Sequence, residues 1–355
     1  MLWTAGDPAM RWTMIDMQVY RDAFHAVLAG ESVYSGGFTE SNLPYLYPPF
    51  ALVVLAPLAL VPLEVAKVVM SALNFIALAF LCRSTLRSTG QSRMLGLGMT
   101  VGCAGLLLLS EPVQQNFMMG QVNLIIAALA LADFVLPSGH RAKGVIMGLL
   151  TGVKLTPGLF VLYYLLSKQY AAARNAAISF AGSVVIGGVL FPADSLHYWS
   201  QAVISNRIGG AHLGNQSLKG ALLRIGAALG VPDQAISLVW LFLFLLLGAG
   251  GLFLATRFAN RDALTVFCCL ATVTLLISPL SWTPHWVLAL PMGLWLASRS
   301  RTRAATFMTL AIMTAVLFAW PVDGVPSGIV WTVYPGGFWG PGAPLWHGIA
   351  YYTLG

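Results

Sequence analysis

The stretch "MIDMQVYRDAF" near the start of the chain is acidic and rich in hydrogen-bonding groups, whereas most of the sequence is strongly apolar. Its Asp16 is a candidate general base, because an ionised carboxylate can take the proton of an attacking hydroxyl group. A solvated loop acid is the alternative interpretation. Four other acids compete for the same role: Asp7, Asp22, Glu31 and Glu40.

A lysine interrupts the apolar stretch 144–166, "GVIMGLLTGVKLTPGLFVLYYLL". A lysine in a membrane segment marks a functional site by default, although a long side chain can also snorkel to the interface. Lys154 stands 10 or more residues from either end of the stretch, which disfavours snorkelling. A cation at this depth suits an anionic ligand, and helix N-termini at the break would assist binding.

The candidate span 120–136 begins with two uncharged hydrogen-bonding residues, Gln121 and Asn123, in the motif "GQVN". Helix capping explains such residues by composition alone. As a cluster of uncharged hydrogen-bonding groups they could instead hold a sugar ring, and both interpretations stay open.

Two further motifs carry polar side chains beside aromatic ones. "GNQSLKGALLRI" presents Asn215, Gln216 and Arg224, which form either a capped interfacial helix or a site for sugar hydroxyls and phosphate. "SPLSWTPHW" presents Trp282 and His285 between two apolar runs. Tryptophan is common at membrane interfaces. His285, between two tryptophans, is either structural or a phosphate or base-orienting contact.

The composition defines the class of scaffold that must position these residues. The chain has 355 residues, of which 58% are hydrophobic and 9% charged, against about 25% charged residues in soluble domains. Its long apolar runs match helices that cross a bilayer. We therefore expect an all-α polytopic membrane protein in contact with bilayer lipid, without a nucleic-acid partner. No glycine-rich phosphate loop or metal-spaced histidine–cysteine cluster occurs, so neither a cofactor nor a metal is expected.

The basic residues predict the topology, because lysine and arginine mark cytoplasmic loops. Twelve of the 19 lie in five short loops: Arg83/Arg87/Arg93, Arg141/Lys143, Lys168/Arg174, Arg257/Arg261 and Arg299/Arg301/Arg303. Expected spans are 64–82, 94–110, 120–136, 175–192, 235–256, 263–279, 285–298 and 304–320, with another from Leu345. The first outer loop is 1–47 and the long outer loop is 193–234.

Two segments do not fit simple spans. Basic residues flank 144–166 on both sides, and Lys154, Thr156 and Pro157 interrupt it, which predicts two half-length helices meeting at a polar break. The segment 47–62 is short and contains four prolines, which predicts a re-entrant or interfacial helix.

Seven motifs in one order carry a resemblance that covers about residues 14–295. They are "IDMQVYRDAFHAVLAGESVY", "YLYPPF" with "APLALVP", "GQVN", the 144–166 stretch, "HYWS", "NQSLKGALLR" and "SPLSWTPHW". Together they resemble the polyprenyl-phosphate-mannose-dependent α-mannosyltransferases of glycosyltransferase family 87, in the GT-C superfamily.

The resemblance implies a single transmembrane glycosyltransferase domain over 1–355, in the cell membrane, with its active site on the extracytoplasmic face. It implies a polyprenyl-phosphate-sugar donor, a glycolipid or glycan acceptor and an inverting reaction with Asp16 as general base. Residues at the matching motif positions are expected to contact substrate: Tyr20, Tyr47, Gln121, Asn123, Lys154, Asn215, Gln216, Arg224, Trp282 and His285.

The chain departs from the family pattern in three places. Family members commonly have a spanning helix before the "D-x-x-V-Y" loop, and the resemblance therefore implies a missing first helix and a truncated last span. One histidine follows "SW" here, in Pro284-His285, where the family often has two. Two alternative functions remain: the same fold using polyprenyl-phosphate-arabinofuranose, and a lipid-linked sugar transporter or flippase.

Overall fold

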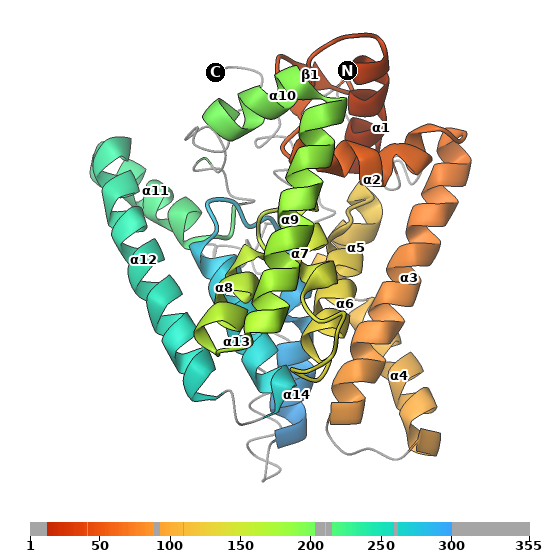
Figure 1. Cartoon of the computed structure of the whole chain (residues 1–355), viewed down its shortest axis with the longest axis vertical. Coiled ribbons are helices and arrows are strands. Elements are labelled where there is room, and N and C mark those ends of the chain that lie inside the picture. The colour runs from red at the N-terminus through yellow and green to blue at the C-terminus, as the bar shows by residue number, and fades with distance from the viewer. Residues whose placement is uncertain are drawn as a thin grey trace.

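The computed structural model describes residues 13–40, 42–88, 93–108, 110–202, 210, 215–258 and 262–299. The expected spans at 304–320 and from Leu345 lie outside the described residues, as does Asp7. The described part of the chain is predominantly helical, and its helices run mostly along the long axis of the molecule (Figure 1).

Among the described residues, three helices are long and apolar enough to cross a membrane: α3 (Leu63–Ser88), α9 (Tyr170–Leu190) and α12 (Asp233–Arg257). Shorter helices pack with them: α4 (Arg93–Leu107), α13 (Ala263–Ile277) and α14 (Leu290–Arg299). Many of their large apolar side chains remain exposed, among them Val68 and Phe242. Such surfaces suit contact with lipid rather than water. The expected all-α polytopic membrane protein is confirmed.

The predicted break in 144–166 is present. Helix α7 (Val145–Val153) ends where Lys154 adopts an extended conformation, and α8 (Gly158–Leu166) begins after Pro157. Proline has no main-chain N–H to donate and cannot continue the preceding helix. The Lys154 side chain therefore projects from the break between the two helices and not from a helix.

A second break lies at the start of the predicted span 120–136. Helix α5 (Glu111–Met119) and helix α6 (Asn123–Phe134) are bent by 116° across a short connection. Gly120 ends α5 in the left-handed conformation, with φ +67°, which terminates a helix without steric cost for glycine. The predicted span 120–136 therefore corresponds to α6, and Gln121 lies in the bend at its start.

The first outer segment forms compact structure over one end of the bundle. Helix α1 (Ile15–Leu28) is followed by a two-stranded antiparallel hairpin of β1 (Gly37–Phe38) and β2 (Leu43–Pro44), a small addition to the expected all-helical fold. Helix α2 (Pro49–Ala59), in the predicted re-entrant segment 47–62, lies across this end (Figure 1).

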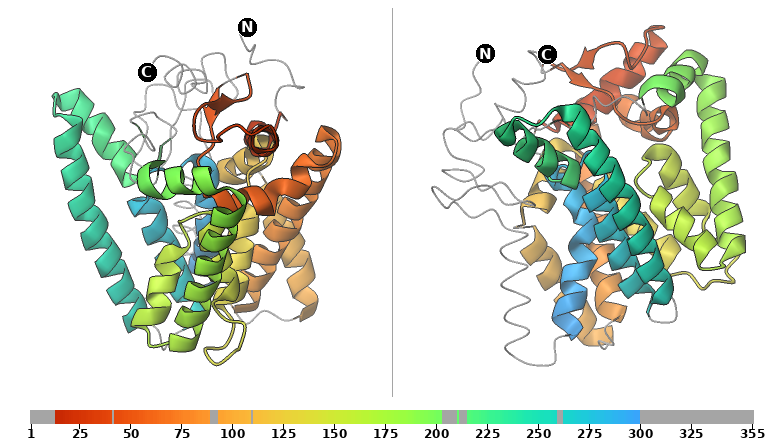
Figure 2. Two further views of the ribbon diagram at one scale, coloured as in Figure 1. Left: turned by 45° about the horizontal axis from the view of Figure 1, so that its top comes forward. Right: turned by 90° about the vertical axis from the view of Figure 1, so that its left-hand side faces the viewer.

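The loop 193–234 is also folded. It contains most of α10 (Pro192–His197), a π-helical turn (Tyr198–Ala202) and α11 (Leu218–Leu229). Asp194 ties α10 to the first segment by accepting from the Ser32 hydroxyl at 2.6 Å. Both views in Figure 2 show α1, the hairpin and α10 together at one end of the molecule.

The described residues of the basic clusters adjoin the opposite end, and Arg261, Arg301 and Arg303 lie outside the described residues. The C-termini of α3, α12 and α14 and the N-terminus of α9, which adjoin these clusters, are at the lower end in Figure 1. Lys143, which was predicted to lie in a cytoplasmic loop, is buried. Its Nζ donates to the carbonyls of Phe134 at 2.7 Å and Leu136 at 2.6 Å. It stabilises the C-terminus of α6, where carbonyl groups lack helical partners.

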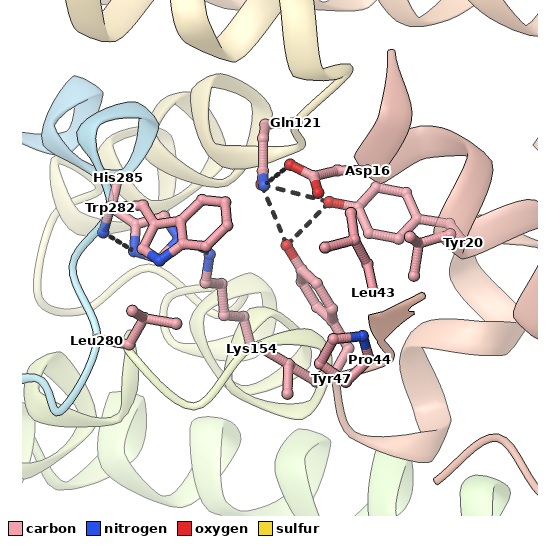
Figure 3. Close-up of a pocket in the computed structure, with 12 residues that line it drawn as sticks. Asp16, Tyr20, Leu43, Pro44, Tyr47, Gln121, Lys154, Leu280, Trp282 and His285 are labelled. Carbon is pink, nitrogen blue, oxygen red and sulfur yellow. Dashed lines mark hydrogen bonds between the residues drawn. The ribbon is translucent and has the colours of Figure 1, made fainter. Parts of the chain in front are cut away.

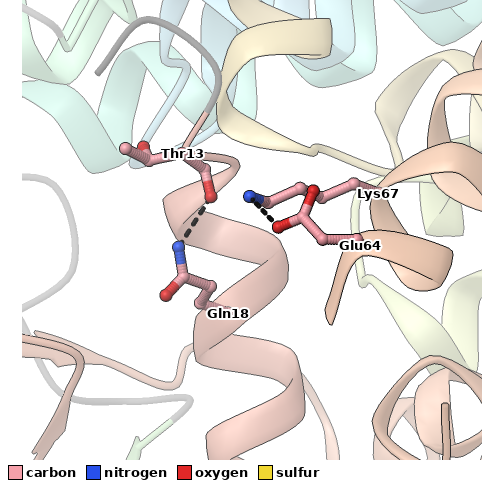
Figure 4. Close-up of polar contacts among 4 residues, drawn as sticks. All are labelled: Thr13, Gln18, Glu64 and Lys67. Carbon is pink, nitrogen blue, oxygen red and sulfur yellow. Dashed lines mark hydrogen bonds and ion pairs between the residues drawn. The ribbon is translucent and has the colours of Figure 1, made fainter. Parts of the chain in front are cut away.

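The start of α1 is held by main-chain and buried contacts. The side-chain amide of Gln18 donates to the Thr13 carbonyl at 2.6 Å (Figure 4). Met17 is fully buried. The nearby ion pair between Lys67 and Glu64, at 2.8 Å, involves a Glu64 side chain that is 79% exposed. Exposed pairs contribute little to stability, so packing rather than this pair positions α1.

Candidate active site

Helix α1 docks directly on the bend between α5 and α6. The main-chain N–H of Met14 donates to the carbonyl of Met118 at 3.0 Å. A Cβ atom at Gly120 would lie 2.7 Å from the Cβ of Met17 and 2.8 Å from that of Met14, closer than packed atoms approach. Glycine is thus required both for the conformation of the bend and for the approach of α1. This docking brings the first turn of α1 beside Gln121.

The carboxylate of Asp16 meets the amide of Gln121 in that corner. Gln121 Nε2 donates to Asp16 Oδ2 at 2.5 Å. The residues are far apart in sequence and are joined only by the docking of α1. An acid and an amide from two elements therefore share one surface of a cavity (Figure 3).

Two tyrosines complete this side of the cavity. The hydroxyl groups of Tyr20 and Tyr47 lie 2.9 Å apart, and they lie 3.3 Å and 3.2 Å from Gln121 Oε1. Tyr20 comes one helical turn after Asp16 on α1, and Tyr47 comes from the segment before α2. Both line the cavity.

Lys154 extends from the α7–α8 break towards the same cavity. Its Nζ donates to Asn123 Oδ1 at 2.6 Å and lies 3.0 Å from His285 Nε2. It also lies 5.4 Å from the centre of the Tyr47 ring. The main-chain N–H of Trp282 donates to His285 Nδ1 at 3.3 Å, so both ring nitrogens of His285 have a neighbour within hydrogen-bond distance.

The cavity has a volume of about 160 Å³. Its lining residues are Asp16, Val19, Tyr20, Leu43, Pro44, Leu46, Tyr47, Gln121, Lys154, Leu280, Trp282 and His285. Figure 3 shows Asp16 on one side, and Trp282 and His285 on the other. A base and a cation on one concave surface suit a reaction in which a proton is removed while negative charge develops elsewhere.

The environment of Asp16 tunes its acidity. Burial raises the pKa of Asp16 to about 6, while hydrogen bonding by Gln121 and the positive charge of Lys154 act in the opposite direction. At neutral pH most of the carboxylate is therefore ionised, with a proton affinity higher than that of a solvated aspartate. A base whose pKa is near the working pH is effective in proton transfer.

The competing acids lie elsewhere. Asp16 is the one acid among the lining residues of this pocket in the described part of the chain. Glu31 and Glu40 are exposed to solvent, and Asp22 is half-buried outside the pocket.

Four predicted substrate contacts are absent from the lining of this cavity: Asn123, which accepts from Lys154, and Asn215, Gln216 and Arg224. Asn215 is buried and donates to the carbonyl of Pro279 at 3.0 Å, while the main-chain N–H of Gln216 donates to the carbonyl of Ser281 at 2.8 Å. Arg224 donates to the carbonyl of Asn215 at 2.8 Å. These contacts fasten the start of α11 to the 279–281 turn, which positions the wall formed by Leu280 and Trp282.

Two buried residues next to the cavity were not found from the sequence. Asn74 on α3 and Asn116 on α5 are fully buried, and the Nδ2 group of each donates to the main-chain carbonyl of Gln121 at 3.1 Å. An amide within the spanning helix α3 was the available signal, because polar groups at membrane depth need internal partners.

The described residues form no cluster that could bind a metal ion. No group of three or more histidine, cysteine, aspartate or glutamate residues suited to a metal ion occurs in the ranges that the structure describes. The four cysteines are free and lie in the packed helices.

A multi-spanning helical scaffold with a buried acid, a lysine and a histidine at one cavity defines the class: an integral membrane enzyme. The family model described as "Glycosyltransferase family 87" matches residues 45–279. The chain belongs to glycosyltransferase family 87, and it is a glycosyltransferase.

Curated relatives cover most of the chain. Two are polyprenol-phosphate-mannose-dependent alpha-(1-2)-phosphatidylinositol mannoside mannosyltransferases, from Mycobacterium tuberculosis (31% identical) and Mycolicibacterium smegmatis (32% identical). Each match covers 88% of this chain and 77% of the relative. A polyprenol-phosphate-mannose-dependent alpha-(1-2)-phosphatidylinositol pentamannoside mannosyltransferase from Mycolicibacterium smegmatis is 28% identical, over 79% of this chain and 69% of the relative. No solved structure matches the chain.

Proposed function

We propose that this glycosyltransferase moves a mannosyl residue from polyprenyl-phosphate-mannose to a hydroxyl group of a phosphatidylinositol mannoside, on the extracytoplasmic face of the cell membrane. The names of the relatives support both substrates and an α-(1-2) linkage. The observation that carries the proposal is the cavity that Asp16 and Lys154 share. A glycosyl transfer between lipid-linked substrates needs a base and an anion-stabilising cation at one place.

Asp16 acts as the base in this proposal. Its carboxylate removes the proton of the acceptor hydroxyl, and the oxygen attacks the anomeric carbon from the face opposite the phosphate. The new carbon–oxygen bond forms as the bond to the phosphate oxygen breaks, so the configuration inverts. The proton remains on Asp16 and returns to solvent afterwards.

Lys154 stabilises the leaving group in this proposal. The departing polyprenyl phosphate carries the electron pair of the broken bond, so it needs positive charge rather than a proton from an acid. Lys154 presents an ammonium group held by Asn123 and His285. His285 then acts mainly through Lys154, with Trp282 beside it forming an apolar wall for the sugar or lipid.

The distribution of basic residues supports the extracytoplasmic location. The cavity is bounded by α1 and the turn at 279–285, at the end opposite the basic clusters. Since basic loops stay in the cytoplasm, the cavity would open to the other side. A donor carried by a polyprenyl lipid suits this location, because the lipid keeps the activated sugar within the bilayer.

The test uses membranes from cells that express the full chain. Radiolabelled polyprenyl-phosphate-mannose is supplied with phosphatidylinositol mannosides of increasing mannose number, and lipid products are separated and digested with an α-(1-2)-specific mannosidase. We expect labelled products one mannose larger that release the label on digestion. Membranes of cells expressing Asp16→Asn serve as the matched control.

Other outcomes select another function. Transfer only from polyprenyl-phosphate-arabinofuranose would replace the mannose donor with a pentose donor. Movement of the labelled donor across the bilayer, without any glycosylated product, would indicate a transporter. A mannosylated product that resists the α-(1-2)-specific enzyme would contradict the linkage but not the donor.

A further inference from the structure

Gln121 connects a buried hydrogen-bond network to Asp16, and its main chain is held by that network. Its main-chain carbonyl accepts from both Asn74 and Asn116, and the Asn116 Nδ2 group also donates to Asn74 Oδ1 at 3.0 Å. The main-chain N–H of Gln121 donates to the carbonyl of Asn116 at 2.9 Å. Three hydrogen bonds therefore hold the backbone of Gln121 in the bend.

The orientation of the Gln121 amide is determined by its neighbours. Of the two tyrosine hydroxyl protons, one is used between Tyr20 and Tyr47, and the other points to Gln121 Oε1. Asn123 Nδ2 donates to the same oxygen at 3.0 Å. Rotating the amide by 180° would bring its NH₂ group against these donors and its oxygen against the carboxylate of Asp16.

The same donors give the network one direction. Because Asn123 donates through Nδ2 to Gln121, its Oδ1 is left to accept from Lys154 at 2.6 Å. Hydrogen bonds thus run from Lys154 through Asn123 and Gln121 to Asp16, each with the donor on the lysine side. Chains of aligned hydrogen bonds strengthen one another in a low-dielectric interior.

We propose that Gln121 is a positioning residue for Asp16 rather than a contact for the sugar, and that Asn74 and Asn116 act through it. Among the described residues, Gln121 alone hydrogen-bonds the Asp16 side chain, through Oδ2. This leaves Oδ1 to take the proton of the acceptor hydroxyl. The assignment rests on the proposed role of Asp16 as the base.

The charged and titratable groups that face Asp16 are Lys154, Tyr20 and Tyr47. Gln121 is neutral and donates to the ionised carboxylate, so it favours the charged form. Loss of this donor should raise the pKa of Asp16 and make the base protonated at higher pH. A residue that merely supports the fold would not shift this titration.

The decisive variant is Gln121→Leu, with transfer measured from pH 5 to 9. We expect the acid limb of the rate to move upward by about one pH unit, with the donor KM unchanged. Gln18→Leu is the matched control, because it makes the same change on α1 at an amide that bonds the Thr13 carbonyl. Its acid limb should coincide with that of the wild type.

A second variant tests the same proposal if Gln121→Leu does not fold. Asn116→Ala changes a residue outside the cavity lining, and it should move the acid limb in the same direction. An unmoved acid limb in the folded variants would overturn the proposal. An increased donor KM with an unmoved acid limb would instead place Gln121 on the sugar.

A measurement that does not require turnover, the titration of Asp16 itself, separates this inference from the proposed function. The carboxyl stretch of Asp16 is followed by infrared titration of the purified full chain, and it is identified by its loss in Asp16→Asn. We expect the Asp16 pKa to rise in Gln121→Leu whether or not mannose is transferred. An unchanged titration overturns the positioning role, while a wild-type protein without transfer overturns only the proposed function.

Discussion

Gln121 donates to the carboxylate of Asp16 at 2.5 Å, although the two residues stand 105 positions apart in sequence. The contact forms because α1 lies on the bend between α5 and α6. It connects the candidate base to the buried amides of Asn74 and Asn116, and through Asn123 to Lys154. The reactivity of Asp16 therefore depends on the packing of the bend as well as on its own burial.

The first prediction concerns the base itself. Asp16→Asn keeps the size of the side chain but removes its ability to take a proton, so transfer should fall by about 10²-fold or more. Donor binding, measured with labelled lipid on purified protein, should persist. Glu31→Gln is the control, because Glu31 is an exposed acid of the same outer segment. Near-normal turnover in Asp16→Asn would remove Asp16 from the role of base.

The second prediction concerns the anion site. Lys154→Ala removes the ammonium group from the cavity, and charge-assisted hydrogen bonds are worth about 1.5–3 kcal/mol. Donor affinity should therefore fall by about tenfold or more, and Lys154→Arg should restore part of it. Lys67→Ala, at a half-buried lysine on α3 outside the cavity lining, is the control. Equal donor affinity in wild type and Lys154→Ala would contradict phosphate binding by Lys154.

The third prediction is the pH dependence of the wild-type enzyme. The pKa of Asp16 is raised to about 6, and only the deprotonated carboxylate can act as a base. The rate should be low below pH 6, rise as the pH passes through that value, and level off above it. A rate profile from pH 4.5 to 8 at saturating donor tests this directly. Full activity at pH 4.5 would show that Asp16 is not the titrating base.

The fourth prediction concerns the bend. Gly120→Ala places a methyl group against Met14 and Met17 and adds strain at φ +67°, costs that together reach about 2 kcal/mol or more. The thermal unfolding temperature in detergent should fall, and transfer should fall further as α1 is displaced. Gly139→Ala is the control, because an added Cβ there meets open space. Wild-type behaviour of Gly120→Ala would contradict the close docking of α1.

The fifth prediction concerns the broken segment. In a cysteine-free background, single cysteines at Gly139 and Lys168 flank α7 and α8, and both should react with an impermeant thiol reagent from the cytoplasmic side. A cysteine at Ser35, in the exposed part of the first outer segment, should react from the other side. Labelling of Gly139→Cys and Lys168→Cys from opposite sides would mean that 144–166 crosses the membrane.

The residue types that could do chemistry were recognisable in the sequence because the apolar background makes them conspicuous. Asp16 and Lys154 stand out as a carboxylate and an amine in a chain with 9% charged residues. The break around Lys154 was also predictable, since Pro157 and the flanking basic loops are local signals. Asn74 offered a comparable signal, an amide within a spanning helix, and its role depended on a partner in another helix.

The sequence by itself determined the membrane class, the break at Lys154 and the resemblance to the family, because these depend on composition, local helix rules and motif order. Only the tertiary structure decided that Asp16, Gln121 and Lys154 share one cavity, while Asn215 and Arg224 fasten α11 to a turn. The physical reason is that these contacts join elements far apart in the chain. Their formation depends on the 116° bend at Gln121 and on the close approach of α1 to Gly120, and neither appears in any local pattern.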